Sequence, residues 1–220
     1  MSTDDVVAAA VELADTQGLA AVTVRALGEA LAVSTMSVYT HVGSRDDLVV
    51  LMADHAHAEL PRPPFGRAGW RTRVRRVAEA NLDLYRRHPW LLDVSDDRVV
   101  LGPGTIAKYD HELRAFDPLQ LPDVTRDAAL TFVLDIVRAS AHSQRPDPRR
   151  EEMSQTWAEW GGRLAAYLGD DFPLAQRVGA AAGEEMGAAY SPTHAWEFAI
   201  ARVLDALAHL GPDGGSVDSS

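Results

Sequence analysis

Apolar residues in this chain recur at intervals of three and four residues, which is the spacing of one face of an α-helix. Val7, Ala10, Val11 and Ala14 are the first example, and residues 124–143 form a longer and more strongly apolar one. The alternation of apolar and polar residues that is typical of half-buried strands is nearly absent. Glycine and proline collect in a few places. These patterns predict an all-α protein.

Glycine and proline also divide the predicted helices into two groups. The segment PRPPFG at 61–66 holds three prolines in four residues and cannot continue a helix. We therefore expect a small helical domain over 1–60, a larger one over 61–210, and a disordered tail over 211–220. Thr23, Ser34 and Ser44 are residue types that begin helices, so short helices are expected directly after each of them. The other helices are expected at 4–16, 70–87, 105–116, 124–143, 150–168, 173–189 and 193–209.

Composition restricts the class of protein. The 220 residues include no cysteine, which excludes disulfides and thiolate metal sites. The N-terminus is acidic, unlike a signal peptide, and no apolar run approaches the ~18 residues of a membrane span. We therefore expect a soluble, cytoplasmic protein with no membrane contact. The net charge of −11, with two arginines against nine acidic residues in 1–60, would by itself argue against a nucleic-acid partner.

The helix expected at 34–41 has an unusual surface. On a helical wheel, Val38 points inward with Val42 beside it, and four residues point outward: Met36, Ser37, Tyr39 and Thr40. Such residues stabilise an exposed helix poorly. They suit a DNA major groove, because short side chains allow close approach, hydroxyls bond phosphates or bases, and methyl groups contact thymine. Together with the helices before it, this helix predicts a helix-turn-helix.

The literal residues carry a family resemblance. GLAAVTVRALGEALAVSTMSVYTHVGSRDDLV, from Gly18 to Val49, resembles the DNA-binding domain of TetR family bacterial transcriptional regulators. The resemblance implies an N-terminal three-helix helix-turn-helix domain, joined by a fourth helix to a larger ligand-binding and dimerisation domain. It implies that Thr35, Met36 and Ser37 meet base edges and that Arg25 reaches a base or phosphate. The expected contacts to the rest of the DNA are Ser34, Tyr39, Thr40, His41 and Arg45.

Alternatives remain open for several of these residues. Tyr39 can be partly core, His41 can pack on the first helix, and Ser34 is a helix cap before it is a contact. Arg25 is interpreted as an arginine without an acidic partner on its helix, which favours a functional role. Family members often carry an aromatic residue near position 40, so Thr40 departs from the pattern.

A second resemblance covers residues 84–116. His88-Pro89-Trp90 and Leu101-Gly102-Pro103 are similar to the ligand-binding domain of regulators related to the tetracycline repressor. This implies an internal pocket, and dimerisation through the last two long helices. The interface anchors would be Trp196, Phe198 and Leu204. The pocket residues would be Trp90, Tyr109, Phe116, Phe132, Trp157 and Trp160, with Asp135, Arg138 and His142.

These pocket residues predict an apolar or aromatic small molecule, although ordinary core packing would explain each aromatic. A buried Asp135 would need a partner, and Arg138 stands three residues on. Pro61 and Val77 replace two residues that grip the drug–magnesium complex in the tetracycline repressor. No metal and no cofactor is therefore expected.

The sequence is compatible with three functions. The favoured one is a homodimeric, ligand-responsive regulator, more specifically a repressor released from a palindromic operator. A DNA-binding regulator controlled by a protein partner or by abundance would share the same N-terminal domain. A helical enzyme is the remote alternative, because none of the motifs GxSxG, GxxxxGK[ST], HExxH and GxGxxG is present. We therefore expect no catalytic residues.

Overall fold

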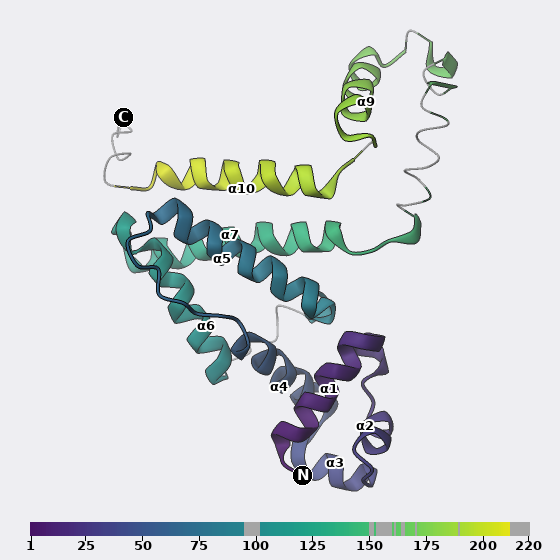
Figure 1. The fold of residues 1–220 in the computed structure, drawn as a ribbon, viewed down its shortest axis with the longest axis vertical. Helices are drawn as coiled ribbons and strands as arrows, with labels where there is room; N and C mark the ends of the chain where they lie inside the picture. Colours follow the sequence, from purple (N-terminus) through teal and green to yellow (C-terminus); the bar gives the residue numbers. More distant parts are fainter. Residues whose placement is uncertain are drawn as a thin grey trace. The chain divides into compact units, whose positions relative to one another are not determined.

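The computed structural model describes residues 1–94, 102–149, 152, 160, 162–163, 166–169, 171–188 and 190–211, none of which lies in a β-strand (Figure 1). The prediction of an all-α protein is confirmed. No helix in the described ranges is long and apolar enough to cross a membrane. The α-helices are α1 (Thr3–Gln17), α2 (Val24–Ala30), α3 (Thr35–Val42), α4 (Arg45–Ala58), α5 (Trp70–Arg87), α6 (Pro103–Leu113), α7 (Asp123–Gln144), α9 (Pro173–Met186) and α10 (Pro192–Ala208). Short 3-10 helices are η1 (Leu19–Ala21), η2 (Pro89–Asp93) and η3 (Arg114–Leu119).

The first helices begin at hydroxyl residues. The predicted caps Thr23, Ser34 and Ser44 each accept a hydrogen bond from the amide three residues further on, at 3.1–3.2 Å. Asp47 completes a capping box by accepting from the Ser44 amide. Because a capped first turn satisfies donors that the helix itself leaves free, these side chains fix where the short helices start.

The N-terminal helices share one apolar core. Val6, Val7, Ala10, Val11 and Ala14 of α1 are buried, as their spacing predicted. This core also includes Leu27 of α2, Val38 of α3, Met52 of α4, and Leu84, Trp90 and Leu91 from α5 and η2. The hydrophobic cluster therefore continues past the 61–66 segment into the helices that follow it.

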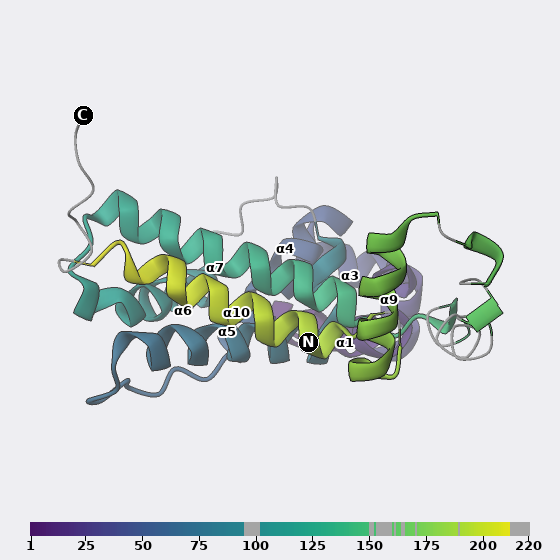
Figure 2. The same ribbon diagram turned by 90° about the horizontal axis from the view of Figure 1, so that it is seen from above.

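Helices α5, α6 and α7 follow the N-terminal helices along the chain and pack together with η3 and the end of α10. Phe116 of η3 is fully buried, and Leu130, Val133 and Val137 line the inner face of α7. The part of α10 that starts at Ile200 runs beside α7 in both views (Figure 2). An ion pair of 3.1 Å joins Arg71 of α5 to Asp205 of α10.

The chain falls into two compact units. The first comprises residues 1–142 and the C-terminal part from Ile200 on, and the second comprises residues 143–199. Helix α9 in the second unit buries none of its side chains and exposes Leu174 and Val178.

Candidate nucleic-acid interface and cavity

The turn between α2 and α3 is tight and carries a strained residue. The Val33 amide donates to the Gly28 carbonyl at 2.9 Å, and a Cβ at Gly28 would lie only 2.9 Å from the Val33 oxygen. Glycine is therefore needed at position 28 for the two helices to approach. Ala32 adopts φ 54°, a left-handed conformation that costs a residue with a Cβ about 1–2 kcal/mol. The turn sets the direction in which α3 projects.

Helix α3 buries one stripe and leaves the rest in solvent. Val38 and Val42 are buried, whereas Thr35, Met36, Tyr39 and Thr40 are exposed, with Met36 at 72%. Ser37 is half-buried and its hydroxyl lies 3.1 Å from that of Ser34. Thr40 donates its hydroxyl to the Met36 carbonyl at 2.9 Å, which leaves its oxygen free to accept. Of the predicted contact residues of α3, Thr35, Met36, Tyr39 and Thr40 are therefore brought together on one exposed surface, whereas Ser37 is half-buried.

The arginines beside α3 have partners that were not anticipated. Arg25 is exposed, but its Nε lies 2.9 Å from Glu29 Oε1, one helical turn away. The interpretation of Arg25 as an arginine without an acidic partner was wrong. Arg45 donates to the carbonyls of Val22 and Leu19 at 3.3 and 3.1 Å, so it holds η1 against the start of α4. His41 is half-buried, and its backbone carbonyl accepts a hydrogen bond from the Thr3 hydroxyl of α1.

A carboxylate from α4 caps the N-terminus of α6. Asp54 accepts from the amides of Gly104 and Thr105 at 3.2 and 2.7 Å, and from the Thr105 hydroxyl at 2.9 Å. A Cβ on Gly102 or Gly104 would collide with Asp54, so both positions require glycine. An anion at a helix N-terminus is favoured by the free amides and by the helix dipole. The Asp54 side chain thus ties α4 to α6.

His57 adds a second link between the same helices. Its Nδ1 lies 2.9 Å from the Thr105 hydroxyl. Because Thr105 donates its only hydroxyl proton to Asp54, Nδ1 of His57 must be the donor in this contact. Burial lowers the pKa of His57 to about 4, and the charge of Lys108 contributes in the same direction. The imidazole is therefore uncharged at neutral pH, with its proton on Nδ1.

A further polar cluster joins α1 to η2. His88 is 5% exposed, and its two ring nitrogens lie 2.9 Å from Asp15 Oδ1 and 3.3 Å from Glu59 Oε2. Trp90 donates its indole N–H to the same Asp15 oxygen at 2.8 Å. Trp90 therefore packs in the core shared with the N-terminal helices.

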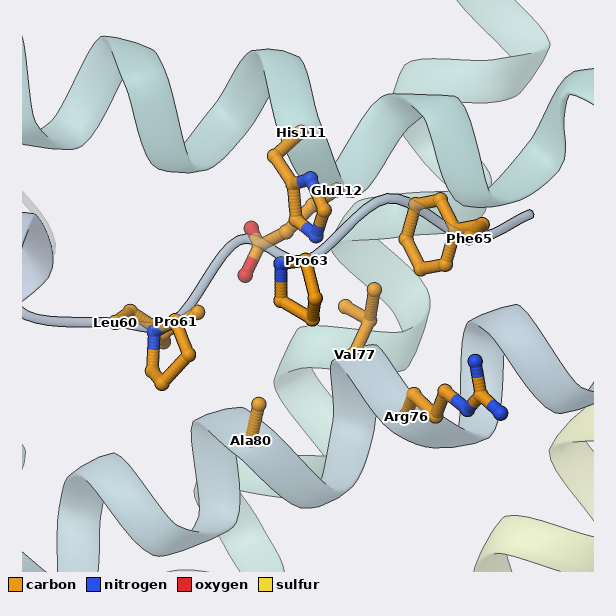
Figure 3. Close-up of a pocket in the computed structure, with 9 residues that line it drawn as sticks. All are labelled: Leu60, Pro61, Pro63, Phe65, Arg76, Val77, Ala80, His111 and Glu112. Carbon is orange, nitrogen blue, oxygen red and sulfur yellow. The ribbon is translucent and has the colours of Figure 1, made fainter.

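A cavity of about 170 Å³ lies between α5, α6 and the segment that connects α4 to α5 (Figure 3). Phe65 of this segment stacks on His111 of α6, with ring centroids 4.7 Å apart and planes 16° apart. Burial lowers the pKa of His111, and the charges of Arg62 and Arg114 lower it further. The remaining lining is mostly apolar: Leu60, Pro61, Pro63, Val77 and Ala80, with Glu112 and Arg76.

The polar wall of the cavity is a buried ion pair. Glu112, 1% exposed, accepts from Lys108 Nζ at 2.8 Å and from Asn81 Nδ2 at 2.5 Å. Asn81 also donates to the Val77 carbonyl, so its amide bridges α5 and α6. The sequence was not used to predict a role for Asn81, Lys108 or Glu112. The spacing of four between Lys108 and Glu112 would have indicated the pair, but burial usually follows only from tertiary contacts.

No predicted pocket residue that the structure describes lines this cavity. Phe116 is a core residue, whereas Tyr109, Phe132 and Asp135 are exposed. Tyr109 donates to Asp127 at 2.7 Å, and this hydrogen bond raises the pKa of its hydroxyl. Trp160 is exposed, and Trp157 lies outside the described residues.

The expected trio of Asp135, Arg138 and His142 does not enclose a buried carboxylate. Arg138 donates instead to the Leu92 and Val94 carbonyls at 3.1 and 2.9 Å, and His142 is exposed like Asp135. The expected pairing of Asp135 with Arg138 rested on burial of the carboxylate, which the structure does not show.

The expected interface anchors differ from one another. Trp196 and Leu204 are each 5% exposed, whereas Phe198 is 60% exposed. A residue that is already buried within one chain offers little surface to a second copy. Of the three, only Phe198 has an exposed side chain.

Helices α1 to α4 contain a helix-turn-helix, and a larger group of helices follows them from α5 on. This is the architecture of a bacterial transcriptional regulator. The family model of bacterial regulatory proteins of the tetR family matches residues 6–52, and that of the tetracyclin repressor-like C-terminal domain matches residues 61–210. The chain belongs to the tetR family.

Relatives and solved structures agree with this membership. The HTH-type transcriptional repressor DrrR1 of Streptomyces coeruleorubidus is 35% identical over 145 residues, 66% of this chain and 54% of that protein. An HTH-type transcriptional regulator of Saccharopolyspora erythraea is 29% identical over 110 residues, 50% of this chain and 47% of that protein. The chain therefore matches about half the length of these relatives. Streptomyces coelicolor ActR in complex with actinorhodin has the same fold, with a TM-score of 0.79, 22% identity, and 98% and 99% of the two chains covered.

Proposed function

We propose that this chain is a homodimeric transcriptional repressor that binds operator DNA through α3 and is released by a small molecule. The observation that carries the proposal is the exposed surface of α3, where Thr35, Met36, Tyr39 and Thr40 face solvent together. Side chains of this kind offer hydroxyls and methyl groups to base edges and to phosphates in a major groove. The name of DrrR1, a repressor, supports the sign of regulation.

A dimer would read a palindromic operator. Two α3 helices related by a two-fold axis would enter successive major grooves about 34–36 Å apart. Control by a small molecule is supported by the cavity beside α6 and by the structures of ActR in complex with actinorhodin and with (S)-DNPA. Release requires that the effector bind the DNA-incompetent conformation more tightly, by about 10⁴-fold to move a population from 1:99 to 99:1.

The test is a binding titration with DNA selected from a random library, followed by fluorescence anisotropy. We expect a palindromic consensus and saturable binding, which the double variant Thr35→Ala/Tyr39→Ala loses. A matched variant, Thr16→Ala/Tyr167→Ala, removes the same side chains from exposed positions outside α3 and should bind as the wild type does. Equal binding by both variants, or selection of no consensus, would remove α3 as the recognition element.

The salt dependence gives an independent check. The arginines of 1–60 are Arg25 and Arg45, and nine acidic residues surround them in the sequence. Phosphate binding must then depend on hydroxyls and amides as well as on few ion contacts. We expect the logarithm of affinity to fall with the logarithm of salt less steeply than the slope of about −10 found for a heavily basic repressor. A slope as steep as that would reveal a basic surface that the two arginines do not explain.

A further inference from the structure

The walls of the cavity beside α6 suit a flat ring. Phe65 and His111 stack on one side, Val77 and Ala80 of α5 lie on another, and Pro63 lies between them (Figure 3). Burial lowers the pKa of His111, which favours its uncharged form, and the other four of these side chains are apolar. Aromatic and aliphatic walls of this kind favour an apolar planar group through area burial and ring contacts.

The volume limits the size of the ring system. At about 170 Å³ the cavity is close to an engineered protein cavity of about 150 Å³ that binds benzene. A single ring fits, and two fused rings require small movements of the connecting segment. That segment is fixed by Arg73, which donates to the Ala68 and Gly66 carbonyls at 2.7 and 3.1 Å and places its guanidinium 5.6 Å from the Phe65 ring.

The charges around the cavity favour an anion. Glu112 is the only acidic residue among the lining residues, and Lys108 and Asn81 already satisfy both of its oxygens. Arg76 lies at the rim, where it is exposed and makes no hydrogen bond or ion pair with any residue in the described ranges. Its neighbour Glu79 lies 3.8 Å from Arg75 instead. A guanidinium at the rim of an apolar cavity can meet a carboxylate with two parallel hydrogen bonds.

We infer that this cavity binds an aromatic carboxylate of one or two rings, with the ring inside the cavity and the carboxylate on Arg76. This inference rests on the proposed function, because it assigns the effector class of the proposed repressor. A cationic ligand is disfavoured, since the Glu112 carboxylate already pairs with Lys108 and a second cation would have to displace it. A neutral aromatic amide would fill the same walls without using the arginine.

The test compares 2-naphthoate with 2-naphthamide, and benzoate with benzamide, by isothermal titration calorimetry on the full chain without DNA. We expect each acid to bind at least tenfold more tightly than its amide. Arg76→Gln should remove this preference while leaving the affinity for the amide unchanged. Arg86→Gln is the matched control, because Arg86 is an exposed arginine of the same helix that pairs with Asp83 at 2.7 Å and does not line the cavity. It should keep the full preference.

A second variant tests the place of the ring. Ala80→Phe inserts a ring into the cavity and should abolish binding of both acid and amide, while thermal unfolding confirms that the variant folds. Equal affinity for acid and amide in the wild type would overturn the inference, as would a preference that survives in Arg76→Gln. Binding of neither compound would also overturn it.

The outcome can be separated from that of the proposed function. A protein that binds 2-naphthoate through Arg76 but selects no DNA sequence would support the cavity assignment and refute the repressor. A protein that binds operator DNA but neither acid would support the repressor and refute the cavity assignment. Where both bind, 2-naphthoate should release the DNA from the wild type at concentrations at least tenfold below those that Arg76→Gln requires.

Discussion

His57 should make the protein less stable in mild acid, and His57→Asn should remove that sensitivity. Burial and the nearby charge of Lys108 lower the pKa of His57 from 6.5 to about 4. Between these pH values the unfolded chain binds a proton that the folded protein does not. Unfolding therefore takes up a proton, and lowering the pH through this window favours the unfolded state. The stability that the neutral imidazole provides is complete above pH 6.5 and decreases as the pH approaches 4.

The magnitude follows from the two pKa values. Each pH unit over which only the unfolded state is protonated changes the free energy of unfolding by about 1.4 kcal/mol. The wild type should therefore lose roughly 2 kcal/mol at pH 5, and on the order of 3 kcal/mol at pH 4, relative to a variant that cannot be protonated. Asparagine is the appropriate replacement because its amide N–H can donate to the Thr105 hydroxyl, as Nδ1 of His57 does.

The measurement is urea unfolding followed by circular dichroism at pH 7, 6, 5 and 4. The difference in unfolding free energy between the wild type and His57→Asn should shift with falling pH in favour of the variant. His194→Asn removes a histidine from an exposed position and serves as the control for the substitution itself. If the curves of wild type and His57→Asn stay parallel from pH 7 to pH 4, the imidazole is not held neutral by burial and the reasoning fails.

Urea or thermal unfolding also tests three other features. Ala32→Gly should raise the free energy of unfolding by about 1 kcal/mol, because glycine adopts φ 54° without strain; no gain would mean that the turn is not strained. Phe116→Ala should cost about 3–5 kcal/mol, and Phe132→Ala on the exposed side of α7 about 0.5 kcal/mol or less; similar losses would contradict the assigned burial. Glu112→Gln should cost about 3–5 kcal/mol by leaving Lys108 unpaired, and most of the loss should disappear in Lys108→Met/Glu112→Leu. If the double variant is as unstable as Glu112→Gln, the unpaired charge of Lys108 is not the cause of the lost stability.

Local features of the fold could be predicted because their causes lie within a few residues. Thr23, Ser34 and Ser44 begin helices where the sequence places them, since a hydroxyl and the amide three residues on are sufficient for a cap. The inner position of Val38 likewise follows from helical spacing alone. The Glu29 partner of Arg25 was equally local, at a spacing of four, and its omission was an error of interpretation.

Contacts between residues that lie far apart in the sequence could not be predicted in the same way. Trp90 reaches Asp15, 75 residues earlier, and Arg138 reaches the Leu92 carbonyl, 46 residues earlier. The side chain of an aromatic or charged residue in an apolar run has several possible partners, and only the packing of helices selects one. The cavity has the same origin, because Phe65 of the proline-rich segment meets His111 only after α6 has packed over that segment.

The Asp54 contact has a consequence for how α4 can move. Gly102, at the start of α6, has no side chain to cap its own helix, so α6 is completed by a residue of another helix. If α4 moved away from α6, both amides and the carboxylate would lose these partners together, and each loss would cost free energy. Separation of α4 from α6 is therefore opposed by all three hydrogen bonds of Asp54 at once, so the two helices should move as one piece while these bonds hold.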